Sequence, residues 1–286
     1  MHKFKFYNPK SLEEVLVLLD HHGDRAKLIA GGTDILIQLR NNDESLANVQ
    51  FIINIDAVPS MRYITEQDGY ISIGSLATHA QIASSSLIKE KVNFLSEAAG
   101  LVGSPQIRHR GTIGGNIVNA SPAADTVPVL VALDAVLMLQ SLSGSREVSI
   151  NEVFLKPYKT SIKSNEILTE IRFKCLPEGS RTHFIKVGRR KALAIARVNL
   201  ATAIKIDDQG IVEDVRIAPG SIMPTPCRAR EAEKILLGSV LTKESILLAC
   251  QKVSEEMIAK SGMRASTFYK KPVVEAITSR ILSKYL

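Results

Sequence analysis

The chain opens with an amphipathic segment that is followed by short apolar runs. Ser11 and Glu14 have the spacing of a helix capping box, and apolar residues recur behind them at helical spacing. Apolar runs typical of buried strands follow at 27–30 and 51–55. The segment 35–39 between them fits either a continuing strand or a helical turn. The pattern therefore predicts a first small α/β unit.

A second α/β unit is predicted from residue 58 to residue 176. Its expected strands cover 70–74, 135–140, 147–150 and 166–173, and its expected helices cover 78–84 and 88–99. A glycine-rich turn is expected at 111–116. Pro177 and Gly179 then interrupt the pattern, and they predict a domain boundary.

The remaining residues predict a separate C-terminal domain. Three consecutive strands with short connections, which favour an antiparallel sheet, are expected at 182–187, 196–206 and 211–217. Helices follow at 229–237, 243–259 and 267–283, and Pro272 lies near the start of the last one, where proline is best tolerated. The predicted fold class is α+β: two α/β subdomains, about 1–57 and 58–176, and then a domain at 177–286 with a three-stranded antiparallel sheet and helices.

Composition and charge remove several classes of function. With 45% hydrophobic and 23% charged residues, the chain has the composition of a globular protein. No run approaches the roughly 18 apolar residues of a membrane span, and the first ten residues lack the apolar core of a secretory signal, so a cytoplasmic protein is expected. The net charge is +7, but the basic residues are dispersed apart from Arg189, Arg190 and Lys191, and no nucleic-acid ligand is expected.

Metal sites and side-chain catalysis have no support in the sequence. The three cysteines, Cys175, Cys227 and Cys250, form no C-x-x-C pair, which argues against disulfides and against a cysteine-bound zinc or iron–sulfur centre. The six histidines form no H-x-x-x-H or H-E-x-x-H pattern, and no G-x-S-x-G elbow is present. We therefore predict neither a metal ligand nor a catalytic residue in this chain.

Two glycine-rich segments carry the candidate chemistry. One reads A-G-G-T-D at Ala30 to Asp34, directly after a predicted strand, and the other reads T-I-G-G-N at Thr112 to Asn116. Paired glycines allow a tight turn whose N–H groups come close to phosphate oxygens. Neither segment has the spacing of a P-loop or of a Rossmann turn. Taken singly, each is also compatible with a plain tight turn.

Together the two segments resemble the FAD pyrophosphate loops of molybdenum hydroxylase flavoproteins, the family of xanthine dehydrogenase and carbon monoxide dehydrogenase. The resemblance covers the chain from Phe4 to Leu282. The motifs that carry it are G-S-P-Q-I-R-H-R-G-T-I-G-G-N-I at 103–117, A-S-P-A-A-D at 120–125, E-I-L at 166–168, F-I-K-V-G-R-R at 184–190, P-T-P at 224–226 and R-A-S-T-F-Y at 264–269.

The resemblance implies a noncovalently bound FAD in a domain formed by 1–176. Residues 28–35 would wrap one side of the pyrophosphate, and 112–116 would supply the second loop. Asp125 would bond a polar part of the cofactor, Leu168 would lie near the flavin, and Lys186 would lie near the isoalloxazine, where a cation raises the reduction potential. The full set of expected contacts is Leu28, Ile29, Ala30, Gly31, Gly32, Thr33, Asp34, Ile35, Val102, Thr112, Ile113, Gly114, Gly115, Asn116, Asp125, Leu168 and Lys186.

Three of these residues also have purely structural interpretations, and one segment departs from the family. Asp125 fits a helix cap, Lys186 fits the solvent face of a strand, and Leu168 fits a core position. Some relatives place an aromatic residue over the flavin after the paired arginines, whereas this chain reads K-A-L-A-I at 191–195.

The function implied by the resemblance is electron transfer. Substrate would be hydroxylated at a molybdopterin centre in a large partner subunit, electrons would cross two iron–sulfur clusters in a small partner, and the FAD would pass them to NAD or another acceptor. A-G-G-T-D is more similar to the xanthine and N-heterocycle branch than to the carbon monoxide branch, which remains an alternative. A flavin-free scaffold subunit and a stand-alone FAD oxidase are two others. The intact glycine pairs oppose the first, and the lack of an evident flavin-attachment residue or catalytic base opposes the second.

Overall fold

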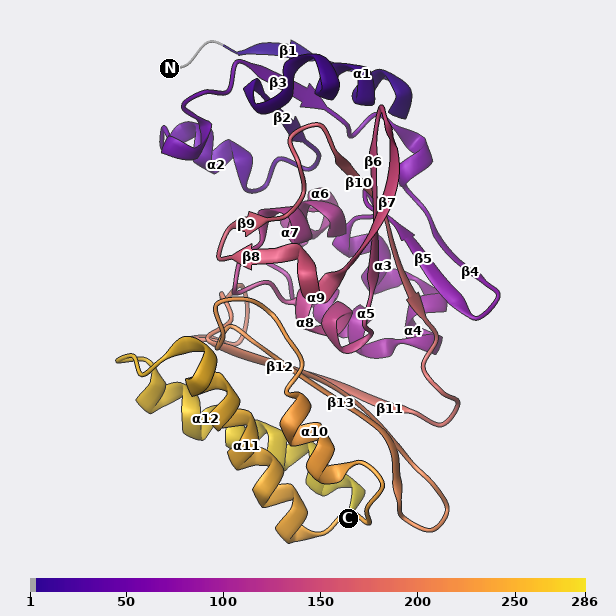
Figure 1. The fold of residues 1–286 in the computed structure, drawn as a ribbon, viewed down its shortest axis with the longest axis vertical. Coiled ribbons are helices and arrows are strands. Elements are labelled where there is room, and N and C mark those ends of the chain that lie inside the picture. Colours follow the sequence, from indigo (N-terminus) through magenta and orange to yellow (C-terminus); the bar gives the residue numbers. More distant parts are fainter. Residues whose placement is uncertain (1–3) are drawn as a thin grey trace.

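The computed structural model describes residues 4–286 and arranges them in three blocks along one long axis (Figure 1). The N-terminal block is a parallel sheet in the order β1-β3-β2 with two helices. Its elements are β1 (Lys5–Tyr7), α1 (Leu12–His22), β2 (Ala26–Ile29), α2 (Ile35–Arg40) and β3 (Phe51–Asn54). The Ser11 hydroxyl caps α1 by accepting the Glu14 N–H, which is one half of the expected capping box. The Glu14 carboxylate accepts the N–H of Lys10 rather than that of Ser11. The ambiguous segment 35–39 is helical.

The middle block contains an antiparallel sheet in the order β4-β5-β10-β6-β7 and most of the helices. The strands are β4 (Ile64–Gln67), β5 (Tyr70–Gly74), β6 (Val136–Ser141), β7 (Gly144–Ser149) and β10 (Ile167–Lys174). The helices are α3 (His79–Ser84), α4 (Ser86–Lys91), α5 (Asn93–Gly100), α6 (Pro105–Arg110), α7 (Ile113–Asn119), α8 (Thr126–Ala132) and α9 (Ile150–Val153), and the short hairpin β8 (Phe154–Lys156) and β9 (Lys159–Thr160) follows them.

In the middle block β4, α6, α9 and the β8–β9 hairpin were not predicted, and two predicted segments have another structure. The single helix expected over 88–99 is two helices, α4 and α5, because the backbone of Val92 leaves the helical region at φ −148° and ψ 56°. The glycine-rich turn expected at 111–116 is the start of α7. There the Thr112 hydroxyl accepts the Gly115 N–H, and this cap begins a helix at the paired glycines.

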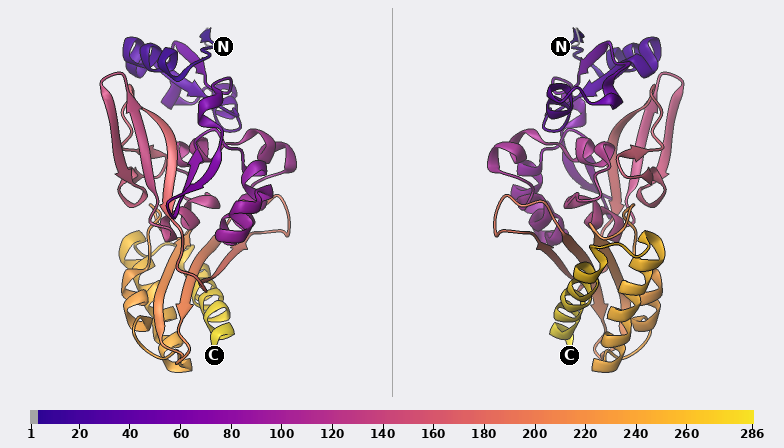
Figure 2. Two further views of the ribbon diagram at one scale, coloured as in Figure 1. Left: turned by 90° about the vertical axis from the view of Figure 1, so that its right-hand side faces the viewer. Right: turned by 90° about the vertical axis from the view of Figure 1, so that its left-hand side faces the viewer.

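The C-terminal block is an antiparallel sheet that lies between two layers of helices. Strands β11, β12 and β13 pair in sequence order, which confirms the predicted three-stranded antiparallel sheet. One face packs against α10, α11 and α12, and the other meets α5 and α8 of the middle block. The side views in Figure 2 show the same stacking of blocks. The elements are β11 (Arg181–Val187), β12 (Val198–Ile206), β13 (Val212–Gly220), α10 (Arg230–Leu236), α11 (Lys243–Ser261) and α12 (Thr267–Leu282).

A buried arginine ties the C-terminal block to the middle block. Arg228 is 7% exposed and donates through Nε to Glu233 Oε1 at 2.8 Å. Its Nη1 donates to Asp134, which lies between α8 and β6 of the middle block. Burial raises the pKa of Glu233, and the guanidinium of Arg228 opposes that rise. One arginine therefore neutralises a buried carboxylate and joins two blocks.

Replacement of Arg228 by methionine should lower the free energy of unfolding by about 3–5 kcal/mol, because Glu233 would stay buried with only the longer contact to Arg230, at 3.7 Å. Urea unfolding at neutral pH measures the loss. The loss should shrink as the pH falls, since a protonated Glu233 needs no cation. Lys234→Met is the matched control: it breaks an exposed pair with Glu231 and should cost less than about 1 kcal/mol. Equal losses in the two variants would contradict the role given to Arg228.

Candidate functional site

The two glycine segments meet in one place, although about eighty residues separate them. A Cβ added to Gly31 would lie 1.8 Å from the carbonyl oxygen of Arg110, so the two backbones are in direct contact there. On the other side of the loop, Asn119 of α7 donates through Nδ2 to Asp34 Oδ1 at 3.0 Å. We call the surface formed by 30–34 and 111–116 the glycine cradle.

The four paired glycines of the cradle do different things. Gly31 and Gly114 let the chain pack on itself, since a Cβ on Gly114 would lie 2.7 Å from Ser75. Gly32 has φ +76°, a left-handed conformation that favours glycine. Gly115 has a negative φ and is exposed, and an added Cβ would meet only the Thr112 hydroxyl, at 2.9 Å. Gly115 is therefore the glycine that keeps the outer face of α7 open.

Free backbone donors concentrate in the first segment of the cradle. Within residues 4–286, the N–H groups of Gly31, Gly32, Thr33 and Asp34 donate to no oxygen of the chain. The N–H groups of Ile113 and Gly114 are used inside the protein, because they donate to carbonyls in the segment 75–77. A run of unpaired N–H groups in a tight turn is suited to phosphate oxygens. The cradle thus fits a pyrophosphate, with its donors on the loop after β2 and an open helix face opposite.

Support for the cradle comes from a segment that the sequence analysis missed. Residues 75–79 follow β5 and accept or donate backbone hydrogen bonds along 111–114. His79 is 2% exposed, its Nδ1 has no partner within the described chain, and its ring lies 3.2 Å from where a Cβ of Gly111 would be. Burial lowers the pKa of His79 to about 4, with a smaller contribution from Arg108. A neutral, buried histidine therefore underlies the cradle, and no local pattern in the sequence indicates it.

A second feature of the site is a buried ion pair between the middle and C-terminal blocks. Lys186 of β11 lies with Nζ 2.5 Å from Asp125 Oδ2 and 3.0 Å from the Leu101 carbonyl, and both charged side chains are below 10% exposed. Asn199 of β12 donates to the other oxygen of Asp125 at 3.3 Å. Burial raises the pKa of Asp125, while Lys186 and Asn199 oppose that rise. Lys186 does not face solvent, and Asp125 precedes α8 without making a capping bond.

A cavity of about 300 Å³ lies beside Lys186. Its walls are formed by the segment 100–105, by Arg108 of α6 and by the loop 188–194. Arg190 donates to the Leu193 carbonyl at 2.7 Å and so fixes the conformation of that loop. Helix α6 begins at this cavity and ends at the glycine cradle, and its six residues correspond to about 9 Å. Cradle and cavity are therefore the two ends of one extended site.

The remaining predicted contacts lie at different depths. Leu28 and Ile29 are half-buried in β2, Ala30 and Thr33 are half-buried in the loop, and Ile35 is buried at the start of α2. Val102 is half-buried, and its carbonyl accepts the Arg108 guanidinium at 3.1 Å. Asn116 accepts a hydrogen bond from Thr126 at 2.8 Å. Leu168 is 4% exposed in the core of β10, where it pairs with Leu139.

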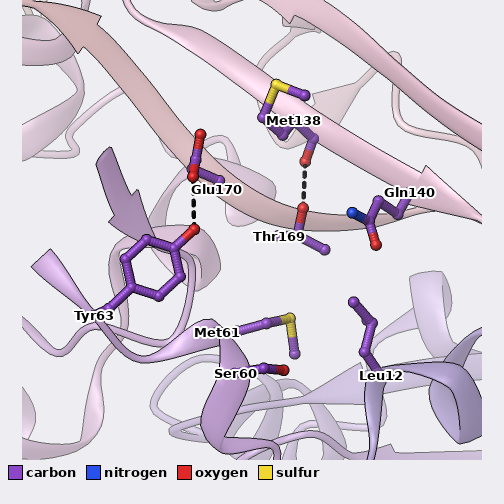
Figure 3. A pocket seen from close by; sticks show the side chains of 8 residues that line it. All are labelled: Leu12, Ser60, Met61, Tyr63, Met138, Gln140, Thr169 and Glu170. Carbon is purple, nitrogen blue, oxygen red and sulfur yellow. Dashed lines mark hydrogen bonds between the residues drawn. The ribbon is translucent and has the colours of Figure 1, made fainter. Parts of the chain in front are cut away.

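Another cavity, of about 220 Å³, lies between the sheet of the middle block, residues 60–63 and Leu12 at the start of α1 (Figure 3). The Tyr63 hydroxyl donates to Glu170 Oε2 at 2.6 Å, and burial raises the pKa of Tyr63. Thr169 closes another side through a bond to the Met138 carbonyl. None of the predicted site residues lines this cavity.

Two features are absent from the described residues, 4–286. No group of three or more histidine, cysteine, aspartate or glutamate side chains is arranged there to hold a metal ion. No helix in that range is long and apolar enough to cross a membrane.

Comparison with known proteins matches both halves of the chain to one family. Residues 2–173 match the FAD binding domain in molybdopterin dehydrogenase, and residues 183–285 match the CO dehydrogenase flavoprotein C-terminal domain. The nicotinate dehydrogenase FAD-subunit of Eubacterium barkeri is 33% identical over 285 residues, which is 98% of this chain and 95% of that protein. The xanthine dehydrogenase FAD-binding subunit of Escherichia coli O157:H7 is 31% identical over 283 residues, 98% of this chain and 94% of that protein.

The fold is similar to a solved structure as well. A chain of the carbon monoxide dehydrogenase of Hydrogenophaga pseudoflava superposes with a TM-score of 0.90 at 31% identity, over 97% of this chain and 95% of that chain. The fold and the site therefore define an FAD-binding protein. The chain belongs to the flavoprotein medium subunits of the molybdenum hydroxylase family.

Gly115→Val should abolish FAD binding while the chain stays folded, because a β-branched side chain would fill the open face of α7 and would displace only the Thr112 hydroxyl, 2.9 Å from the added Cβ. Flavin released by acid from the purified variant, relative to protein, measures the effect. Ser86→Val is the control: it places valine on another exposed first helical turn, on α4. Full flavin content in Gly115→Val would show that this face of α7 does not approach the cofactor.

Lys186→Met should lower the free energy of unfolding by about 3–5 kcal/mol, since Asp125 would remain buried without its cation. Urea unfolding should be measured on flavin-free chains, so that altered FAD affinity does not contribute. Addition of Asp125→Asn to the variant should restore part of the loss. Lys205→Met removes a more exposed pair with Glu213 and should cost less than about 1 kcal/mol. A loss no larger than that of the control would argue that the Lys186 pair is energetically neutral.

Proposed function

We propose that this chain takes electrons from iron–sulfur clusters of a partner subunit and passes them, through bound FAD, to NAD or another acceptor. The single observation that carries the proposal is the extended site: a phosphate-suited cradle at one end of α6 and a cavity with a buried lysine at the other. A dinucleotide with its pyrophosphate in the cradle would place its other end toward Lys186.

The residues of the chain would position the cofactor and shield it. The N–H groups of 31–34 would donate to the pyrophosphate, and the open face at Gly115 would allow it to approach α7. Asp125 and the Leu101 carbonyl hold the Lys186 ammonium at the cavity wall, where the Asp125 carboxylate balances its charge. The loop 188–194 would limit access of water. FAD itself supplies the two-electron carrier, so no acid or base from the chain is required.

Substrate oxidation is assigned to other subunits. Relatives bear the names FAD-subunit, FAD-binding subunit and medium chain of dehydrogenases, which supports a division of labour among subunits. We propose a small iron–sulfur partner and a large molybdopterin partner for this chain. For the substrate we propose xanthine or another N-heterocycle, in keeping with the A-G-G-T-D segment and with the nicotinate and xanthine dehydrogenase relatives. A carbon monoxide dehydrogenase type remains the alternative, because that relative is 30% identical.

An anionic acceptor is supported by the charge around the cavity. Arg189, Arg190 and Lys191 are exposed on the loop that forms one wall, and none of them makes an ion pair within the described residues. Arginine and lysine are the usual partners of phosphate groups. NAD, which carries a pyrophosphate, is therefore the acceptor that we propose for this chain.

The division of labour predicts that removal of FAD separates two activities. In the intact complex with Gly115→Val in this chain, substrate should still bleach the iron–sulfur clusters, while acceptor reduction should fall to background. Absorbance of the clusters and reduction of NAD or a dye are followed in parallel. The Ser86→Val complex should retain both activities. If both fall together in a complex that keeps all subunits and metals, this chain is not the exit for electrons.

A further inference from the structure

Three cations gather at one end of the C-terminal block without a carboxylate. Arg197 stacks its guanidinium over the ring of Tyr269 at 4.5 Å, and Lys270 donates to the Ser221 carbonyl at 2.5 Å. Burial lowers the pKa of Lys270, and the charges of Arg264 and Arg197 lower it further. Both arginines are therefore close enough to Lys270 to repel its ammonium. Among residues 4–286, no carboxylate forms an ion pair with any of them. Such a cluster of like charges favours an anionic partner.

Large exposed apolar side chains stand within two residues of these cations in the chain. Ile195 and Phe268 are each 80% exposed, and Met263 is 64% exposed. They lie on the loop before β12 and around the start of α12, at the left end of the C-terminal block in Figure 1. Aromatic residues, methionine and arginine are the types enriched at the centres of protein interfaces, where they also supply most of the binding energy. Their grouping indicates a surface that is covered by another protein.

The position of this surface relates it to electron transfer. The N–H of Arg197 donates to the carbonyl of Val187, the residue directly after Lys186, at 2.8 Å. Arg197, the first of the three cations in the chain, therefore lies beside the cavity at the Lys186 end of the site. A protein bound here would reach the end of the site away from the glycine cradle. A second copy of this chain is disfavoured, because a twofold contact would bring the same cations together.

We propose that Arg197, Arg264 and Lys270, with Ile195, Met263 and Phe268, form the docking surface for the iron–sulfur partner subunit. We call these six residues the basic–apolar patch. The partner would present carboxylates to the three cations and an apolar pocket to Phe268. This inference rests on the proposed function, which requires an electron donor close to the Lys186 end of the site. The net charge of +7 on the chain would also speed its association with an acidic partner.

The test uses the assembled complex, purified through a tag on this chain. Arg264→Glu and Phe268→Ala should each raise the dissociation constant for the iron–sulfur subunit by about tenfold or more, measured by native mass spectrometry at increasing salt. The wild-type complex should weaken with salt more steeply than Arg264→Glu. Matched controls are Lys89→Glu, the same charge change on exposed α4, and Leu247→Ala, which truncates a side chain of α11 that is 59% exposed. Both controls should leave the complex intact.

Flavin content separates this inference from the proposed function. The patch variants should keep their full FAD and lose the iron–sulfur subunit, whereas Gly115→Val should lose FAD and keep all subunits. Unchanged affinity in both patch variants would overturn the assignment. Loss of the molybdenum subunit with retention of the iron–sulfur subunit would also overturn it, and so would loss of FAD from the patch variants.

Discussion

The contact between Gly31 and the Arg110 carbonyl is the constraint on which the site depends. It brings the loop after β2 against the end of α6, just before α7, and no side chain larger than hydrogen fits between the two backbones. The loop can then present a run of free N–H groups toward the face that Gly115 leaves open. Because the contact joins the N-terminal block to the middle block, the shape of the cradle depends on the relative position of these blocks.

Sequence patterns predicted most of the fold because its elements follow local rules. The Ser11 cap indicates the start of α1, and the spacing of the apolar residues indicates helices and strands. The short connections within 181–220 indicate an antiparallel sheet. These elements are present. The strands β1 and β4, the helices α6 and α9 and the β8–β9 hairpin were not predicted. The division of 88–99 into two helices and the helical start at Thr112 were also missed. In both cases the structure depends on one residue, through its backbone conformation or its capping bond. The spacing of apolar residues does not predict either of these.

The residues of the candidate site were predicted from the family resemblance. The contacts that hold these residues in place were not predicted. The two glycine segments and Lys186 are motif positions that the sequence displays directly. The Asp125 partner of Lys186 lies 61 residues away, and the free N–H groups are visible only once the hydrogen bonds are assigned. The position of His79 beneath the cradle was not predicted either, since a single histidine after a strand has no distinctive sequence pattern. Pairings across long separations are set by packing of the whole domain, which a local pattern does not encode.

The position of β10 bears on how the protein is made. This strand lies at the centre of the five-stranded sheet, hydrogen-bonded to β5 on one side and to β6 on the other, yet it is the last strand of that sheet in the chain. Its pairing with β5 closes a loop of roughly a hundred residues, and contacts between residues so far apart in the sequence slow folding. During synthesis the sheet stays open along its middle until Lys174 has left the ribosome. Until β10 is in place, the edges of β5 and β6 are exposed to incorrect pairing, and the domain that binds FAD is incomplete.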